Sequence, residues 1–140
     1  MKLLRKYSKL IPLLLVLCVL LGGVAYGSYT FTKFSGNIQI LQRNTRFDHK
    51  HRSTKDTENP WRVTLDYSGE GKNTITTFWL EDFYGKNVSQ DVEAEYNGIL
   101  QYLCPAYSSA SGIDVYLAGE NNNYNFDEYY VEGRWSPQDN

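Results

Sequence analysis

The chain has 140 residues, 41% of them apolar and 15% aromatic, and its 14 Lys and Arg against 16 Asp and Glu give a net charge of -2. This length leaves room for one small domain and excludes multidomain enzymes, while the apolar content argues against disorder along the whole chain. The charge is unevenly spread. Residues 28–62 carry seven Lys and Arg against three Asp and Glu, a sum of +4, whereas residues 63–140 carry three against thirteen, a sum of -10.

The N-terminal 27 residues predict an export signal. Four cations lie within the first nine residues, an apolar run follows over 10–21, and small residues come next. This order is typical of signal peptides, with cleavage expected between Gly27 and Ser28. An uncleaved membrane anchor is the alternative, because the apolar stretch reaches the lower limit of about 17 residues for a span. In both cases the cationic end stays in the cytoplasm and residues 28–140 are expected outside it.

The rest of the chain is divided into an N-terminal strand with a basic loop over 28–60 and a β-domain core over 61–140. Residues 43–60 have almost no apolar content and predict a long exposed loop. Its cations are candidates for binding an anionic membrane surface or envelope polymer. These surface-binding candidates are Arg43, Arg46, Lys50, Arg52 and Lys55.

Alternation with period two predicts strands along most of the chain. It runs over 29–40, where Gly36 interrupts it, and is clearest over 61–67. A turn at 68–71 leads into a second strand over 73–80, and these two strands are expected to form a hairpin. A further turn is signalled by the Gly-Lys-Asn sequence that starts at Gly85.

The second half of the chain continues the pattern. Segments 113–117 and 129–135 alternate again and predict a terminal hairpin. Residues 88–103 fit either a helix or two shorter strands, and strands are favoured. Cys104 is the single Cys after residue 28, so it has no intrachain disulfide partner and is interpreted as a small buried apolar residue. Five to eight short strands predict an all-β fold, either an antiparallel sandwich or a small barrel.

Several short motifs together resemble a family of small exported Gram-positive bacterial proteins of unknown function. The resemblance extends from Asn59 to Trp135 and implies an extracytoplasmic β-rich domain, but no catalytic or ligand residue. The motifs are Asn59-Pro60-Trp61, Tyr67-Ser68-Gly69-Glu70-Gly71, Thr76-Thr77-Phe78-Trp79-Leu80-Glu81, Ala106-Tyr107-Ser108-Ser109-Ala110-Ser111 and Glu120-Asn121-Asn122-Asn123-Tyr124-Asn125.

No catalytic constellation is apparent, and we expect no enzymatic activity. Glu81 and Asp82 are adjacent, so on a strand they point to opposite faces and cannot share a cleft. His49 and His51 lie in the predicted basic loop, where nothing would hold an imidazole rigidly and like charges disfavour a metal.

The loop after residue 120 is the best candidate for an ion. Asn121, Asn123, Asn125 and Asp127 place oxygen atoms at every second position, as calcium ligands can be placed. The EF-hand pattern is missing, however, because Phe126 stands where that loop has Gly. Asparagine is also favoured in turns, so a hairpin loop is the preferred interpretation and no cofactor is expected.

Adjacent aromatic residues offer another functional candidate. Phe78 and Trp79 are consecutive, as are Tyr129 and Tyr130, so one ring of each pair is expected to face away from the interior. Exposed rings on a sheet can stack on sugars or anchor a protein partner, whereas a second sheet covering both faces would explain them structurally.

Two functions follow from these features. The first is a cell-surface or secreted interaction module that binds an envelope polymer, a membrane surface or a protein, and we favour it. The second is a secreted bacteriocin-like effector or its accessory factor. Nucleic acid is not an expected partner, because the exported domain is acidic.

Overall fold

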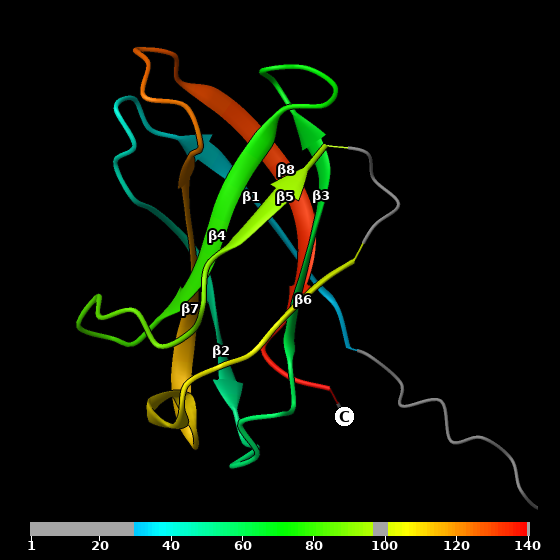
Figure 1. The fold of residues 1–140 in the computed structure, drawn as a ribbon, viewed down its shortest axis with the longest axis vertical. Coiled ribbons are helices and arrows are strands. Elements are labelled where there is room, and N and C mark those ends of the chain that lie inside the picture. The colour runs from blue at the N-terminus through cyan, green and yellow to red at the C-terminus, as the bar shows by residue number, and fades with distance from the viewer. Residues whose placement is uncertain (1–29, 97–100, 140) are drawn as a thin grey trace, which may run out of the picture.

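The computed structural model describes residues 30–96 and 101–139, so the signal or anchor predicted over 1–27 lies outside the described residues. Eight strands and one short 3-10 helix follow one another along this part of the chain (Figure 1). They are β1 (Thr32–Ile38), β2 (Thr45–Arg52), β3 (Trp61–Ser68), β4 (Ile75–Glu81), β5 (Val92–Glu95), β6 (Tyr102–Cys104), η1 (Ser108–Ala110), β7 (Ile113–Asn121) and β8 (Tyr129–Ser136). None of the described helices is long and apolar enough to cross a membrane.

The strands form two four-stranded antiparallel sheets (Figure 1). We call the sheet with the order β1-β8-β3-β6 sheet A, and the sheet with the order β2-β7-β4-β5 sheet B. The predicted all-β antiparallel fold is therefore confirmed. Of the two forms that the sequence left open, the described strands adopt the sandwich, because they make two separate sheets and do not close into one barrel.

The core lies between the two sheets. Trp61, Val63 and Leu65 of β3 point inward, as the alternation predicted. Tyr67 does not follow it and is 44% exposed, because the pairing register of β3 shifts after Leu65. Three rings join the layers: the Phe34 centroid lies 5.0 Å from that of Phe47 and 5.4 Å from that of Phe78. Burying a side chain of this size contributes about 1.5–3 kcal/mol, so this contact between the sheets is a main source of stability.

Both predicted hairpins are wrong, because the chain changes sheet between those strands. The strands expected over 61–67 and 73–80 form as β3 and β4, but they lie in sheets A and B, respectively. The strands expected over 113–117 and 129–135, β7 and β8, are separated in the same way. Alternation shows which face of a strand is buried but not which strand lies beside it. Among the described strands, β4 and β5 are the consecutive ones that pair.

The long exposed loop predicted over 43–60 is wrong for its first half, where Thr45–Arg52 forms β2. This strand pairs with β7 at the edge of sheet B, and Phe47 packs against the core. Charged side chains are common on edge strands because they oppose pairing with other chains, and here they hide the strand pattern. The strands of 28–60 pair with strands of 61–140, since β1 lies beside β8 and β2 beside β7.

Three other expectations have clear outcomes. Within 88–103 the chain forms the two short strands β5 and β6, as favoured, while residues 97–100 lie outside the described part. Gly36 does not interrupt β1. Cys104 is 5% exposed, and burial raises the pKa of its thiol above the ordinary value. It is therefore a small buried side chain, as predicted.

Tyr129 makes the free energy of unfolding depend on pH in the alkaline range. Its hydroxyl lies 3.2 Å from Thr76 Oγ1, and burial raises its pKa to about 12. An unfolded chain releases this proton near pH ~10, so the free energy of unfolding falls by about 1.4 kcal/mol per pH unit between pH ~10 and ~12. We expect Tyr129→Phe to be about 1 kcal/mol less stable at pH 8, because Thr76 loses a partner.

At pH 11 that difference should vanish, since only the tyrosine protein has lost stability through ionisation at this position. Urea unfolding of both proteins at pH 8 and pH 11 measures it. A difference of the same size at both values would contradict the assignment of a buried, neutral Tyr129.

Candidate functional site

The five basic residues predicted to bind an envelope surface do not form one patch. Arg43 and Lys55 are exposed but lie beyond opposite ends of β2, and Lys50 is half-buried. Arg46 is exposed yet pairs with a carboxylate of β4. The fifth, Arg52, is buried. These five residues therefore do not form a continuous basic surface.

Arg52 is a structural residue, which corrects its assignment to the surface. It is 1% exposed, and its guanidinium donates to the backbone carbonyls of Pro137, Asp56 at 3.1 Å and Asn59 at 2.6 Å. Burial lowers its pKa, and the Asp56 carboxylate partly offsets this. The side chain thus connects the end of β2 to the following loop and to the C-terminal segment.

Three of the four aromatic residues proposed as exposed are buried. Phe78 is 0% exposed in the core, and Tyr129 is 6% exposed because it also faces inward. Trp79 lies outside the core cluster, but it is only 6% exposed, and its Nε1 donates to Glu81 Oε1 at 3.0 Å. Tyr130 is exposed, at 42%. Adjacent residues do point to opposite faces, but the outward face around Trp79 is itself covered.

The candidate calcium loop uses its oxygen atoms within the protein. Asn121 Oδ1 accepts the backbone N–H of Asn123 at 2.8 Å, and Asn125 Oδ1 accepts that of Asp127 at 3.1 Å. Asn121 also donates to Asn125 at 2.8 Å. These bonds are the local turn bonds that asparagine favours. They support the interpretation of this segment as a turn, but the turn is not a hairpin loop, because β7 and β8, which it connects, lie in different sheets.

A buried carboxylate organises the outer face of sheet B. Glu81 ends β4 and is 5% exposed. Arg46 from β2 donates to its Oε2 through Nε at 3.0 Å and Nη2 at 2.6 Å. Trp79 and Asn44 donate to Oε1 at 3.0 Å and 3.4 Å. Hydrogen bonds between charged partners are about twice as strong as neutral ones, so Glu81 holds Arg46 in one position.

Arg46 in turn braces the loop that follows β4. It donates to the carbonyls of Phe83 and Asp82, both at 3.3 Å. Asp82 Oδ1 accepts two backbone N–H groups of the same turn, that of Tyr84 among them, at 2.9 Å. Gly85 has a φ of 83°, which permits the sharp reversal. The turn is therefore held from both sides and presents its side chains on a supported backbone.

Three aromatic rings meet where this turn approaches β7. Phe83 and Tyr84 are 69% and 90% exposed, and their rings lie 5.4 Å apart, nearly perpendicular at 85°. The Tyr116 ring of β7 lies 6.5 Å from that of Phe83, and the Arg46 guanidinium lies 4.5 Å from the Tyr116 centroid. A cluster of large exposed rings is typical of a contact surface, whereas a single exposed ring is not.

The rings line a hollow of about 350 Å³, which we call the aromatic pocket. The loop after β4 and the short helix η1 lie at the same end of β7, at the lower left of Figure 1, and both contribute to it. Its size suits a small chemical group. The residues that line it are Asp82, Phe83, Tyr84, Ser109, Ile113, Asp114 and Tyr116.

The sequence had suggested that the two histidines lie on a loop that would not hold them. In the structure they lie on β2, beside this pocket. The His49 ring is 5.2 Å from the Tyr116 ring, and His51 Nδ1 lies 2.9 Å from Asp114 Oδ1. Within the described ranges 30–96 and 101–139, no three His, Cys, Asp or Glu side chains are placed to hold a metal ion together.

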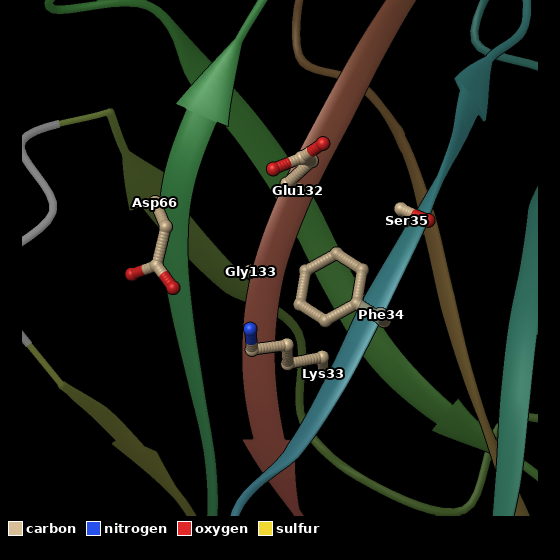
Figure 2. A pocket seen from close by; sticks show the side chains of 6 residues that line it. All are labelled: Lys33, Phe34, Ser35, Asp66, Glu132 and Gly133. Carbon is tan, nitrogen blue, oxygen red and sulfur yellow. The ribbon is translucent and has the colours of Figure 1, made fainter.

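A second hollow, of about 370 Å³, lies on sheet A. Figure 2 shows Gly133 at its centre, with Lys33, Asp66 and Glu132 around it. Arg134 holds Asp66 through two hydrogen bonds, at 2.8 Å and 3.0 Å. Charges of both signs surround this hollow, and none of the exposed aromatic side chains lines it. The aromatic pocket is therefore the stronger candidate site.

Sequence reasoning missed the rings of this site, although part of the signal was present. Phe83 and Tyr84 stand between Asp82 and the turn that starts at Gly85. Two large apolar side chains inside a tight turn cannot both reach a core, so their exposure could have been predicted. The approach of Tyr116 depends on strand pairing across the sheet and has no local signal.

A family model described as "Protein of unknown function (DUF2712)" matches residues 23–139. The resemblance to a family of unknown function, expected over 59–135, is confirmed in that form, and the match extends it toward the N-terminus. No curated protein and no solved structure matches the chain.

Proposed function

The chain belongs to the DUF2712 family of unknown function, and from this starting point we propose that it is an exported, non-enzymatic binding module. Its binding surface is the aromatic pocket on the outer face of sheet B. Its ligand is a component of the cell envelope. Export is supported by the cationic and apolar order of the first 27 residues, and binding is supported by the exposed rings of Phe83 and Tyr84.

The support of these two rings carries the proposal. An exposed ring on a mobile loop loses conformational entropy when it binds, which reduces affinity. Here Arg46 and Asp82 brace the turn, and buried Glu81 fixes Arg46. A charged side chain and a buried carboxylate are thus used to position two rings that make no contribution to the core. Such preorganisation is typical of binding surfaces.

The test is retention on isolated cell walls of the bacterium that encodes the chain. The full chain, residues 1–140, is expressed, and the protein that accumulates is purified and sedimented with the walls. We expect the double variant Phe83→Ala/Tyr84→Ala to bind at least about tenfold more weakly. Removing a ring that dominates an interface costs about 2 kcal/mol or more of binding free energy, and about 1.4 kcal/mol corresponds to a tenfold change in affinity.

The matched control is Tyr124→Ala/Phe126→Ala, which removes two rings of similar exposure, 74% and 78%, from the loop between β7 and β8. This variant should bind as the unchanged protein does. Equal losses in both double variants would contradict the assigned surface. Absence of wall binding together with killing of neighbouring strains would instead favour the secreted effector.

A further inference from the structure

We propose that the aromatic pocket recognises an alkylammonium group, such as a quaternary ammonium carried by an envelope component. This inference rests on the proposed binding function and names the chemistry of the group that is bound. Three rings and two carboxylates line one hollow, and that combination is the one that selects a bulky organic cation.

The rings provide the first part of the argument. The perpendicular arrangement of Phe83 and Tyr84, with Tyr116 inclined at 55° to Phe83, presents aromatic surface in different directions around one space. A tetrahedral cation such as tetramethylammonium has methyl groups on all sides and can contact several rings at once. Each ring face attracts positive charge through its quadrupole.

Arg46 supports this reading of the rings. Its guanidinium already lies over the Tyr116 ring at 4.5 Å, so an aromatic surface of this site accepts a cation within the protein itself. The charge of Arg46 is offset by Glu81, whose Oε2 lies 2.6 Å from Nη2. The ion pair therefore adds no net positive charge next to the pocket.

The carboxylates provide the second part. Asp82 uses Oδ1 for the backbone of its own turn, and Asp114 uses Oδ1 for His51. No Lys, Arg or His lines the pocket, so Asp82 and Asp114 give its lining residues a net negative charge. An anionic polymer would be repelled from this surface, and a neutral ligand would gain nothing from the charge. A cation gains from both the rings and the carboxylates.

The volume gives the third part. A space of about 350 Å³ accommodates one trimethylammonium group together with the start of its chain. Such a group keeps its charge at every pH and is too weakly hydrated to resist transfer onto aromatic surface. Lysine ammonium groups are more strongly hydrated and are expected to bind less well.

The experiment is an NMR titration of the purified protein at pH 8. Choline and tetramethylammonium are compared with 3,3-dimethyl-1-butanol, a neutral molecule of the same shape as choline. We expect both cations to shift the backbone amides of 82–86 and 113–116, and to bind at least about tenfold more tightly than the alcohol. Equal binding of the alcohol, or shifts confined to other residues, would overturn the proposal.

Matched variants separate the two attractions. Tyr84→Phe keeps the ring and should bind choline normally, whereas Tyr84→Leu keeps an apolar side chain without a ring and should bind several-fold more weakly. Tyr84 is 90% exposed, so neither change affects folding. Asp114→Asn should also weaken choline binding, while Asp127→Asn, which changes an exposed carboxylate in a distant loop, should not.

Competition distinguishes this inference from the function on which it rests. If the wall-bound protein is released by choline but not by the alcohol, both proposals are supported. Retention that depends on Phe83 and Tyr84 but is insensitive to choline would refute the ammonium group and leave the binding module standing. Absence of any retention would refute the module itself.

Discussion

Replacing Arg52 by Met is expected to lower the free energy of unfolding by about 3 kcal/mol or more. The change leaves the carbonyl groups of Pro137, Asp56 and Asn59 without this donor, and of these three hydrogen bonds the first is buried and the other two are partly buried. Each buried acceptor that loses its partner costs about 1–3 kcal/mol, and part of the loop can rehydrate. Urea unfolding followed by tryptophan fluorescence measures the loss.

Lys55→Met is the control, because it removes a cation from the same stretch of sequence at an exposed position. Its effect should remain within about 0.5 kcal/mol. Arg52→Lys should fall between the two, since lysine keeps the charge but cannot reach three carbonyl groups with the same fixed geometry. Equal stabilities of Arg52→Met and Lys55→Met would show that the hydrogen bonds of Arg52 to the backbone do not stabilise the fold.

Arg52 also illustrates a limit of sequence reasoning. In the sequence it is one cation among several in a stretch with almost no apolar residues, and a buried guanidinium cannot be recognised there. Its partners are backbone carbonyls, which every residue has. The strand that carries it was hidden for the same reason, because the inward positions of β2 hold Phe47 as their main apolar side chain.

Strand formation and burial were more predictable than strand pairing. The alternation that begins at Trp61 predicted the strand correctly and its inward face as far as Leu65, beyond which the register shifts and Tyr67 is exposed. It carried no information about the neighbour of β3, which is β8, a strand close to the C-terminus. The turn at 68–71 and the Asn-rich segment after Asn121 can each connect strands within one sheet or between two sheets, so the expected hairpins failed although their strands formed.

The candidate site was predictable in part. Exposed aromatic residues were expected, and Tyr130 is one of them. The predicted rings were adjacent pairs on strands, whereas the most exposed pair, Phe83 and Tyr84, lies within a turn and was not predicted. Arg46 was selected for its charge as a surface-binding residue. Its place in the structure comes from Glu81, which is 35 residues further along the chain. Pairing of this kind requires the fold to be known.

Gly133→Ala is expected to have the other large effect, with a loss of more than about 4 kcal/mol or failure to accumulate as soluble protein. Gly133 lies in β8, which pairs with both β1 and β3 in sheet A. A Cβ atom at this position would overlap the Thr64 carbonyl oxygen and lie 2.6 Å from the Phe34 ring. Expression level and thermal unfolding measure the effect.

Gly36→Ala is the matched control on the neighbouring strand β1. Its added Cβ would lie 3.1 Å from the edge of the Phe47 ring, which can shift slightly, so the loss should be at most about 1–2 kcal/mol. The double variant Gly133→Ala/Phe34→Leu separates the two obstacles at Gly133. Because the Thr64 carbonyl belongs to the backbone of the paired strand, removing the ring cannot relieve that overlap. Recovery of stability in the double variant would therefore show that the side chain, and not the close approach of the strands, requires glycine there.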